Sequence, residues 1–152
     1  MNEQLQLRLM DNPTLWQCSM AEKLSTPCQH TGYSNLNAIL PNGGWPSDGF
    51  VEMITPLWSV NELQLLVPLM KKAMQQNRWI LLVSPPFELS QDDLDNFGVD
   101  NNCILIMRSE YSCNDALLSI EKALKTESCA MVLAWSDWLP NAVVRRLQHA
   151  AN

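Results

Sequence analysis

The residues whose pattern comes closest to a known chemistry lie at Thr55–Glu62, between a predicted strand and a predicted helix. The apolar run Phe50–Ile54 predicts a buried strand, and apolar residues recur at helical spacing over Val60–Gln76. A loop in this position binds phosphate when it reads G-x-x-x-x-G-K-[ST]. Its glycines then let backbone N–H groups approach phosphate, and its Lys neutralises the charge. Here the loop contains no glycine, Asn61 stands at the Lys position, and Glu62 would repel a triphosphate. The loop therefore has the position of a phosphate site without its chemistry.

Other groups that could support catalysis are weak. Asp92, Asp93 and Asp95 lie at a predicted helix start, where carboxylates usually cap the helix and favour its dipole. Neither Ser59 nor Ser136 has a histidine nearby in the sequence or a G-x-S-x-G context. The five cysteines form no CxxC pair, and the two histidines lie far apart. We therefore expect no enzyme activity, no cofactor and no bound metal.

Length and composition indicate a single globular domain. The chain has 152 residues, of which 47% are hydrophobic, so it can bury one sizeable core. Its formal net charge of −6 argues against nonspecific nucleic-acid binding, which depends on a basic face. No signal peptide is visible, and no apolar run approaches the roughly 18–20 residues that span a bilayer. These features predict a cytoplasmic protein without direct nucleic-acid or membrane contact.

Strand and helix signals alternate from residue 31 onward, which predicts an α/β fold with a mainly parallel sheet covered on both faces. The predicted strands are Gly49–Thr55, Trp79–Ser84, Cys103–Met107 and Cys129–Trp135. The predicted helices are Val60–Gln76 with a break or bend at Pro68, a short helix from Ser90 to Phe97-Gly98, Ser112–Thr126, and Pro140–Ala151. Residues 1–30 are predicted to form a separate N-terminal arm, with a short helix at Glu3–Met10.

The loop Ser84–Leu89 is a candidate binding element. It leaves the carboxyl end of a predicted strand, where open α/β sheets usually place their functional loops. Its two prolines make it stiff, so presenting Phe87 to a partner would cost little ordering entropy. An equally weighted alternative is that Phe87 and Leu89 fix the next helix onto the sheet.

Tryptophan and arginine side chains supply further candidates. Trp58 follows the first predicted strand, so it either fills the vacated phosphate position or forms part of a partner surface. Arg78 precedes the second predicted strand and is either a solvated charge or an interface residue. Trp79 and Trp135 lie at strand ends, and we interpret both as packing residues.

The stretch from about Thr31 to Ala151 resembles the SulA superfamily, which includes the SulA cell-division inhibitors and the ImuA proteins of mutagenic repair. The similarity rests on the GGWP turn at Gly43–Pro46 and on the sequences VEMITPLWSVNELQLLVPLM, NRWILLVSPP with ELS, and VLAWSDWLP with VRRLQHAA. Both groups resemble RecA in fold while lacking its nucleotide chemistry. The resemblance implies a RecA-like three-layer sandwich with a degenerate phosphate loop over residues 31–152. Either family would continue into a final strand, which we expect this stretch to lack.

The resemblance also implies a function through protein contact. SulA proteins bind the tubulin-like FtsZ and block its polymerisation in the SOS response, and they can form homodimers. The alternative is an ImuA-type adaptor that binds ImuB or RecA in a translesion complex, favoured by Leu15-Trp16 and the GGWP turn. The match to SulA places Arg78 and Val83 where inhibition is sensitive, with the loop and Asp93 as weaker candidates. The predicted partner-binding residues are Arg78, Val83, Pro85, Pro86, Phe87, Glu88, Leu89, Asp93 and Trp58.

Overall fold

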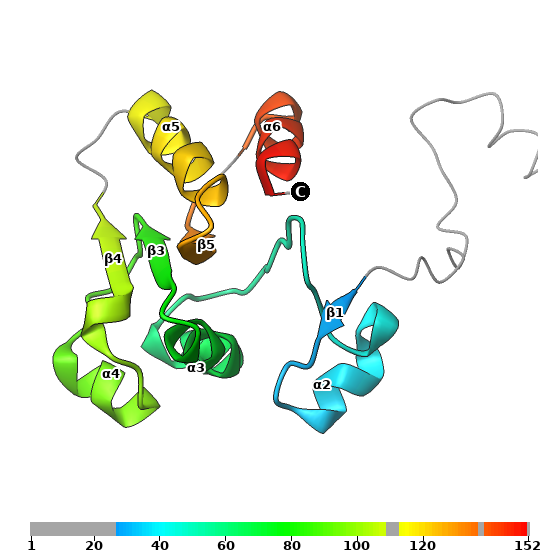
Figure 1. Ribbon diagram of the computed structural model, residues 1–152, viewed down its shortest axis with the longest axis vertical. Coiled ribbons are helices and arrows are strands. Elements are labelled where there is room, and N and C mark those ends of the chain that lie inside the picture. Colours follow the sequence, from blue (N-terminus) through cyan, green and yellow to red (C-terminus); the bar gives the residue numbers. More distant parts are fainter. Residues whose placement is uncertain (1–26, 109–112, 137–138, 152) are drawn as a thin grey trace, which may run out of the picture.

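A computed structural model of the chain describes residues 27–108, 113–136 and 139–151. Its centre is a three-stranded parallel sheet in the order β4-β3-β5. The strands are β3 (Trp79–Val83), β4 (Ile104–Met107) and β5 (Cys129–Ala134). Helices α3 (Val67–Gln75) and α4 (Gln91–Phe97) lie on one face, and α5 (Cys113–Leu124) and α6 (Asn141–Ala151) lie on the other (Figure 1). The predicted α/β fold with a parallel sheet covered on both faces is confirmed, and its layers are compatible with a RecA-like sandwich.

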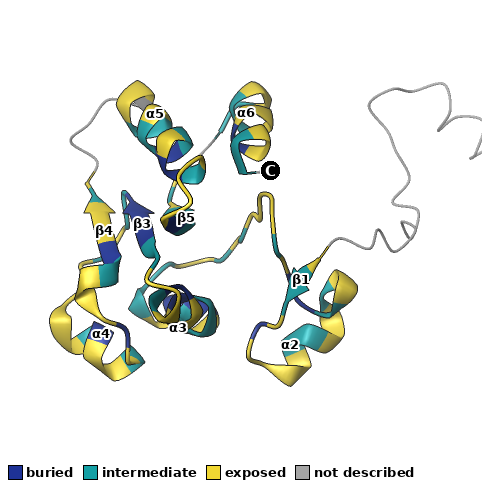
Figure 2. Ribbon diagram, viewed as in Figure 1, coloured by how far each residue is buried: buried dark blue, intermediate teal, exposed yellow. Residues whose placement is uncertain are grey.

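Strand β3 is the most buried element of the fold. Ile80 and Leu82 belong to the apolar cluster that α3 and α4 share, whereas Leu81 and Val83 belong to the cluster that α5 and α6 share. None of the four is more than 7% exposed, and Figure 2 shows the strand as buried. Burying an aliphatic side chain contributes about 1.5–3 kcal/mol, so this short strand is a large source of stability.

The other elements predicted within the described residues agree with the structure to within two residues at each end, apart from one strand. Ser90 is the N-cap of α4, and Gly98, with a φ of 66°, ends it in the left-handed region. The helix predicted over Val60–Gln76 divides into a 3₁₀ helix, η2 (Val60–Leu66), and α3. Pro68 lies in the first turn of α3, where its missing N–H leaves no hydrogen bond unmade.

The strand predicted over Gly49–Thr55 is wrong. The segment forms no strand, and Phe50, Val51 and Ile54 are 37%, 45% and 90% exposed. An apolar, β-branched run becomes a strand only when a neighbouring strand pairs with its backbone. Within the described part of the chain the sheet ends at β5, so Phe50–Ile54 is not a neighbour of β3.

A small unit precedes the sheet. β1 (Cys28–Gln29) pairs antiparallel with β2 (Trp45–Pro46), and between them lie α2 (Ser34–Ile39) and the 3₁₀ turn η1 (Pro41–Gly43). The Tyr33 hydroxyl donates to the Gln64 carbonyl of η2 at 2.7 Å. At Gly32 an added Cβ would lie 2.6 Å from Pro68 Cγ, so only glycine permits this close approach. The unit is therefore tied to η2 and α3. The predicted helix Glu3–Met10 and most of the predicted arm lie outside the described residues.

Two helical segments begin with reciprocal side-chain capping. The Ser90 N–H donates to the Asp93 carboxylate at 2.9 Å, and the Asp93 N–H donates to Ser90 Oγ at 3.2 Å. At the start of η2 the Ser59 N–H donates to the Glu62 carboxylate at 2.7 Å. The side-chain hydrogen bonds from the serines, followed by those from their backbone, lower the pKa of Glu62 and of Asp93. The two carboxylates therefore favour the folded state in their charged form.

Arg78 joins the amino ends of β3 and β5. Its Nε donates to the Glu127 carbonyl at 2.8 Å, and its Nη2 donates to the Cys129 carbonyl at 2.5 Å. The preceding residue, Asn77, has a φ of 53°, so the chain turns sharply before the strand. The planar guanidinium can reach both carbonyls at once, which a lysine ammonium cannot do with the same geometry.

We expect Arg78→Ala to lower the free energy of unfolding by about 1–2 kcal/mol, because two charge-assisted hydrogen bonds are lost. Arg78→Lys should recover only part of this loss. Urea denaturation of both variants measures the effect, with Arg145→Ala on the exposed surface of α6 as control. A stability for Arg78→Ala equal to that of the control would contradict the structural role.

The capping carboxylates predict a loss of stability in acid. Their pKa values in the folded protein lie below the ordinary 4.5 for Glu62 and 3.8 for Asp93. Their stabilising contribution is therefore complete above pH 4.5 and is lost as the pH falls through the lower, folded-state values. The variant carrying Glu62→Gln and Asp93→Asn should melt below the wild type at pH 7, and this difference should shrink between pH 5 and pH 2. Thermal melts across this range test the idea, and a difference independent of pH would oppose it.

Candidate functional site

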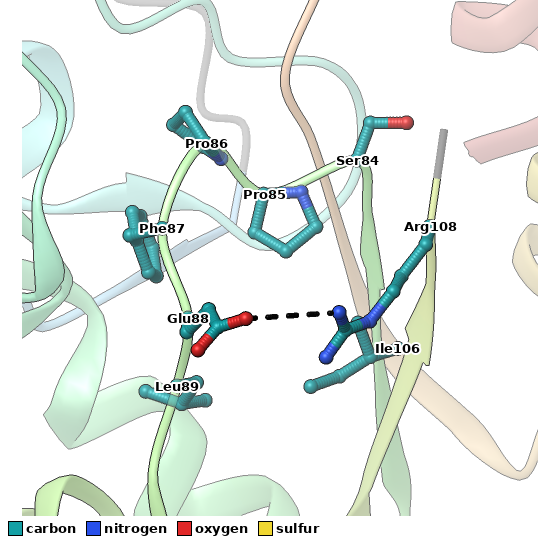
Figure 3. Close-up of a pocket in the computed structure, with 8 residues that line it drawn as sticks. All are labelled: Ser84, Pro85, Pro86, Phe87, Glu88, Leu89, Ile106 and Arg108. Carbon is teal, nitrogen blue, oxygen red and sulfur yellow. Dashed lines mark ion pairs between the residues drawn. The ribbon is translucent and has the colours of Figure 1, made fainter. Parts of the chain in front are cut away.

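A cleft opens at the carboxyl end of β3, beside the outer strand β4. Its volume is about 300 Å³ (Figure 3). Ser84–Leu89 forms one wall, and Ile106 of β4 with the following Arg108 forms the other. The cleft thus lies at the edge of the sheet where parallel α/β folds place their binding loops. It has room for one or two side chains of another molecule.

The loop that forms the wall leaves the sheet in a defined direction. Ser84 has a φ of 51°, a left-handed conformation that is uncommon for a residue other than glycine. Its N–H donates to the Met107 carbonyl at 2.8 Å, which holds the start of the loop on β4. Pro85 and Pro86 follow, and each ring fixes its own φ. The prediction that this loop is stiff is therefore consistent with its local geometry.

Three aromatic rings from separate parts of the chain meet behind the cleft. Trp135, directly after β5, contacts Phe87 edge to face, with the ring centroids 5.4 Å apart at 85°. It also contacts Trp58 in the same manner, at 5.9 Å and 89°. Such pairs contribute about 0.5–1.5 kcal/mol each beyond the area they bury. The rings therefore join the Thr55–Glu62 loop to the Ser84–Leu89 loop.

The mouth of the cleft carries one charge of each sign. Arg108 Nη1 lies 3.9 Å from Glu88 Oε1, and the two side chains are 71% and 91% exposed (Figure 3). An ion pair this open contributes only about 0–1 kcal/mol, because water screens it. Both charges are thus accessible to an incoming partner.

The start of η2 is satisfied from within the chain. The Glu62 carboxylate accepts hydrogen bonds from both the N–H and the hydroxyl of Ser59. A carboxylate therefore stands at the helix start, where a phosphate-binding loop would present N–H groups to an anion. Trp58, the residue before Ser59, packs its ring on Trp135.

The structure brings together only some of the predicted site residues. Pro85–Leu89 and Trp58 lie around the cleft and the aromatic contacts behind it. Arg78 directly precedes β3, at the end opposite the Ser84–Leu89 loop. At the usual rise per residue of a strand, Arg78 and Val83 lie roughly 16 Å apart. Val83 is only 4% exposed, so it underlies the loop, and Asp93 caps α4.

Two residues that line the cleft, Ile106 and Arg108, were missed by sequence reasoning. The interpretation of Trp135 as a packing residue agrees with its contacts to Phe87, Trp58 and the apolar cluster of α3 and α4. A signal for Ile106 and Arg108 was available, since they lie near or just beyond the carboxyl end of a predicted parallel strand, and such ends share one edge of a sheet.

Within the described residues, no group of His, Cys, Asp and Glu side chains could hold a metal ion. No described helix has the length and apolar character needed to span a membrane.

Comparisons with known proteins agree on one family. The family model for the cell division inhibitor SulA matches residues 56–152. The SulA of Serratia proteamaculans is 27% identical over 128 residues, which cover 84% of this chain and 76% of that protein. The SulA of Yersinia pestis is 33% identical over 88 residues, so the match spans 58% of this chain and about half, 52%, of that relative. The crystal structure of SulA from Pseudomonas aeruginosa superposes with a TM-score of 0.50 and 26% identity, over 64% of this chain and 84% of that one. Because the family model covers more than half of the sequence, this chain belongs to the SulA family of cell division inhibitors.

Proposed function

We propose that this protein inhibits cell division in the SOS response by binding FtsZ and blocking its polymerisation. Membership of the SulA family supports division inhibition, and the resemblance of the Arg78–Leu89 region to SulA supports FtsZ as the partner. The observation that carries the proposal is the cleft beside β4. Its wall, Ser84–Leu89, is stiff and packs on Trp135 through Phe87. The relatives described above are SulA proteins, which favours this function over the ImuA-type adaptor.

The cleft suits contact with a protein. Its wall combines apolar side chains with an exposed charge of each sign at the mouth, which is the composition of an interface with an apolar centre and a polar rim. A loop held by Ser84, Pro85 and Pro86 loses little freedom on binding, whereas a mobile loop would lose about 0.5–1.5 kcal/mol per ordered side chain. Phe87, half-buried against Trp135, is the aromatic side chain of this wall, and we propose it as the anchor.

Inhibition by contact requires no catalysis, and we propose that the protein binds no nucleotide. The carboxylate of Glu62 stands at the start of η2 with its hydrogen bonds to Ser59 already made. A triphosphate approaching Thr55–Glu62 would meet this negative charge and the packed ring of Trp58 without glycine N–H groups to receive it. The Thr55–Glu62 loop can therefore form part of a protein-binding surface, but it lacks the groups that bind a phosphate.

The oligomeric state and cellular location follow the same resemblance. We propose a cytoplasmic protein that can form homodimers, with its RecA-like domain beginning near residue 31. Size-exclusion chromatography with light scattering would measure the mass in solution, and a purely monomeric mass at high concentration would exclude the dimer.

Phe87→Ala should weaken binding to FtsZ by about 1–3 kcal/mol, or roughly fivefold to 160-fold, because it removes the proposed anchor. Leu118→Ala is the matched control, since Leu118 is an exposed apolar residue on α5 outside the cleft. GTP-dependent light scattering of FtsZ, titrated with each variant, reports the inhibition. Unchanged FtsZ assembly in a several-fold excess of the wild-type protein would overturn the proposed function.

Isothermal titration with Mg²⁺-ATP should give no saturable heat up to millimolar nucleotide. The physical reason is that Asn61 replaces the Lys that neutralises phosphate charge, and that the negative Glu62 replaces the Ser or Thr whose hydroxyl binds Mg²⁺. GTP serves as a second nucleotide under the same conditions. Saturable binding of either one would contradict the non-nucleotide role of this loop.

A further inference from the structure

Trp135 occupies the point where the two loops of the carboxyl edge meet. Its backbone N–H donates to the Val83 carbonyl at 3.1 Å, which continues the pairing of β5 with β3 by one residue. Its backbone is therefore attached to the most buried strand of the sheet, directly before the Ser84–Leu89 loop begins. Its ring then contacts Phe87 on that loop and Trp58 on the other.

The prolines alone do not place Phe87. They fix their own φ angles, but the direction of the chain beyond Pro86 also depends on what the following side chains contact. Leu89 packs against the apolar cluster of α3 and α4, to which Trp135 also contributes. The ring of Phe87 packs edge-on against Trp135, and Glu88 between the two contacts is largely exposed. Contacts to Trp135 and to the cluster beneath it thus hold the second half of the loop.

Trp58, on the other loop, is the second aromatic residue that Trp135 contacts. Thr55–Trp58 has no regular secondary structure, and Leu57 is 73% exposed, so the ring of Trp58 is a principal attachment of this segment to the sheet. Both edge-to-face pairs use the same indole. A change in the packing of one loop therefore changes the support of the other.

We propose that Trp135 is the positioning residue of the recognition surface, and that it couples the Thr55–Trp58 segment to the Phe87–Leu89 part of the loop. The recognition surface then consists of parts of two loops, Thr55–Trp58 and Phe87–Leu89, which the indole of Trp135 holds in position. The effect on FtsZ rests on the proposed function, whereas the coupling between the loops does not.

Backbone ¹⁵N relaxation tests the coupling in the isolated protein. Trp135→Ala should lower the order parameters of the Phe87, Glu88 and Leu89 amides into the flexible range, below about 0.6, and Trp135→Phe should restore values near those of the wild type. Trp79→Ala is the matched control, because Trp79 is a half-buried tryptophan of the same sheet at the other end of β3. The two alanine variants are compared at temperatures that give equal global stability, so that a general loosening is subtracted. Equal order parameters at Phe87–Leu89 in both would overturn the proposal.

Trp58→Ala provides an independent variant if Trp135→Ala does not fold. It removes a ring that does not belong to the Ser84–Leu89 loop, so a merely local role predicts no change there. The coupling predicts lower ¹⁵N order parameters at Phe87–Leu89 in this variant as well. Order parameters identical to those of the wild type would refute it.

Titration of FtsZ assembly separates this inference from the proposed function. If the wild type inhibits, Trp135→Ala should need at least tenfold more protein for half-inhibition, Trp135→Phe should need less than threefold more, and Trp79→Ala should match the wild type at equal folded fraction. Full inhibition by Trp135→Ala would refute the role in recognition. If the wild type does not inhibit, the proposed function fails, and the relaxation experiment alone decides the coupling.

Discussion

The rest of the structure depends on strand β3 being paired along both edges and buried on both faces. Its residues alternate between two apolar clusters, so each helical layer packs on the same five-residue strand. A strand under this constraint cannot shift its register without exposing every side chain to the wrong face. The positions of Arg78 at one end of β3 and of the start of the Ser84–Leu89 loop at the other are therefore fixed by the core.

The polar and aromatic groups of the Thr55–Glu62 loop are occupied by contacts within the chain. At the start of η2 the Glu62 carboxylate accepts hydrogen bonds from the N–H and the hydroxyl of Ser59. Beside it the indole of Trp58 packs on Trp135. Because Gly49–Thr55 forms no strand, the strand, loop and helix order of a phosphate-binding site is absent at this loop. Charge repulsion and an apolar ring are both unfavourable for a triphosphate, whereas a loop held in this way suits the contact with a protein that we propose.

The free-energy contributions of the contacts distinguish those that position the loop from those that are available to a partner. The Glu88–Arg108 pair is open to water and adds little to stability, so these charges are available for selecting a partner. The two edge-to-face ring pairs are less exposed to screening and contribute more to the position of the loop. Arg78 belongs with the stabilising contacts, because its guanidinium already donates to two backbone carbonyls. Loss of inhibition on changing Arg78 would therefore need a measurement of stability beside it before a contact role could be assigned.

The sequence by itself determined the helices and strands whose burial and capping patterns lie within a few neighbouring residues. The run Trp79–Val83 predicted a buried strand, and Ser90 with Gly98 predicted both ends of α4, because capping and burial patterns depend on neighbouring residues. The same kind of pattern failed at Phe50–Ile54, since pairing needs a second strand that the segment itself does not contain. Only the tertiary structure decided that Trp135 lies between Trp58 and Phe87 and that the Arg78 guanidinium donates to the carbonyls of Glu127 and Cys129. Contacts between residues far apart in the chain depend on how the helices and strands pack, and no local periodicity encodes that packing.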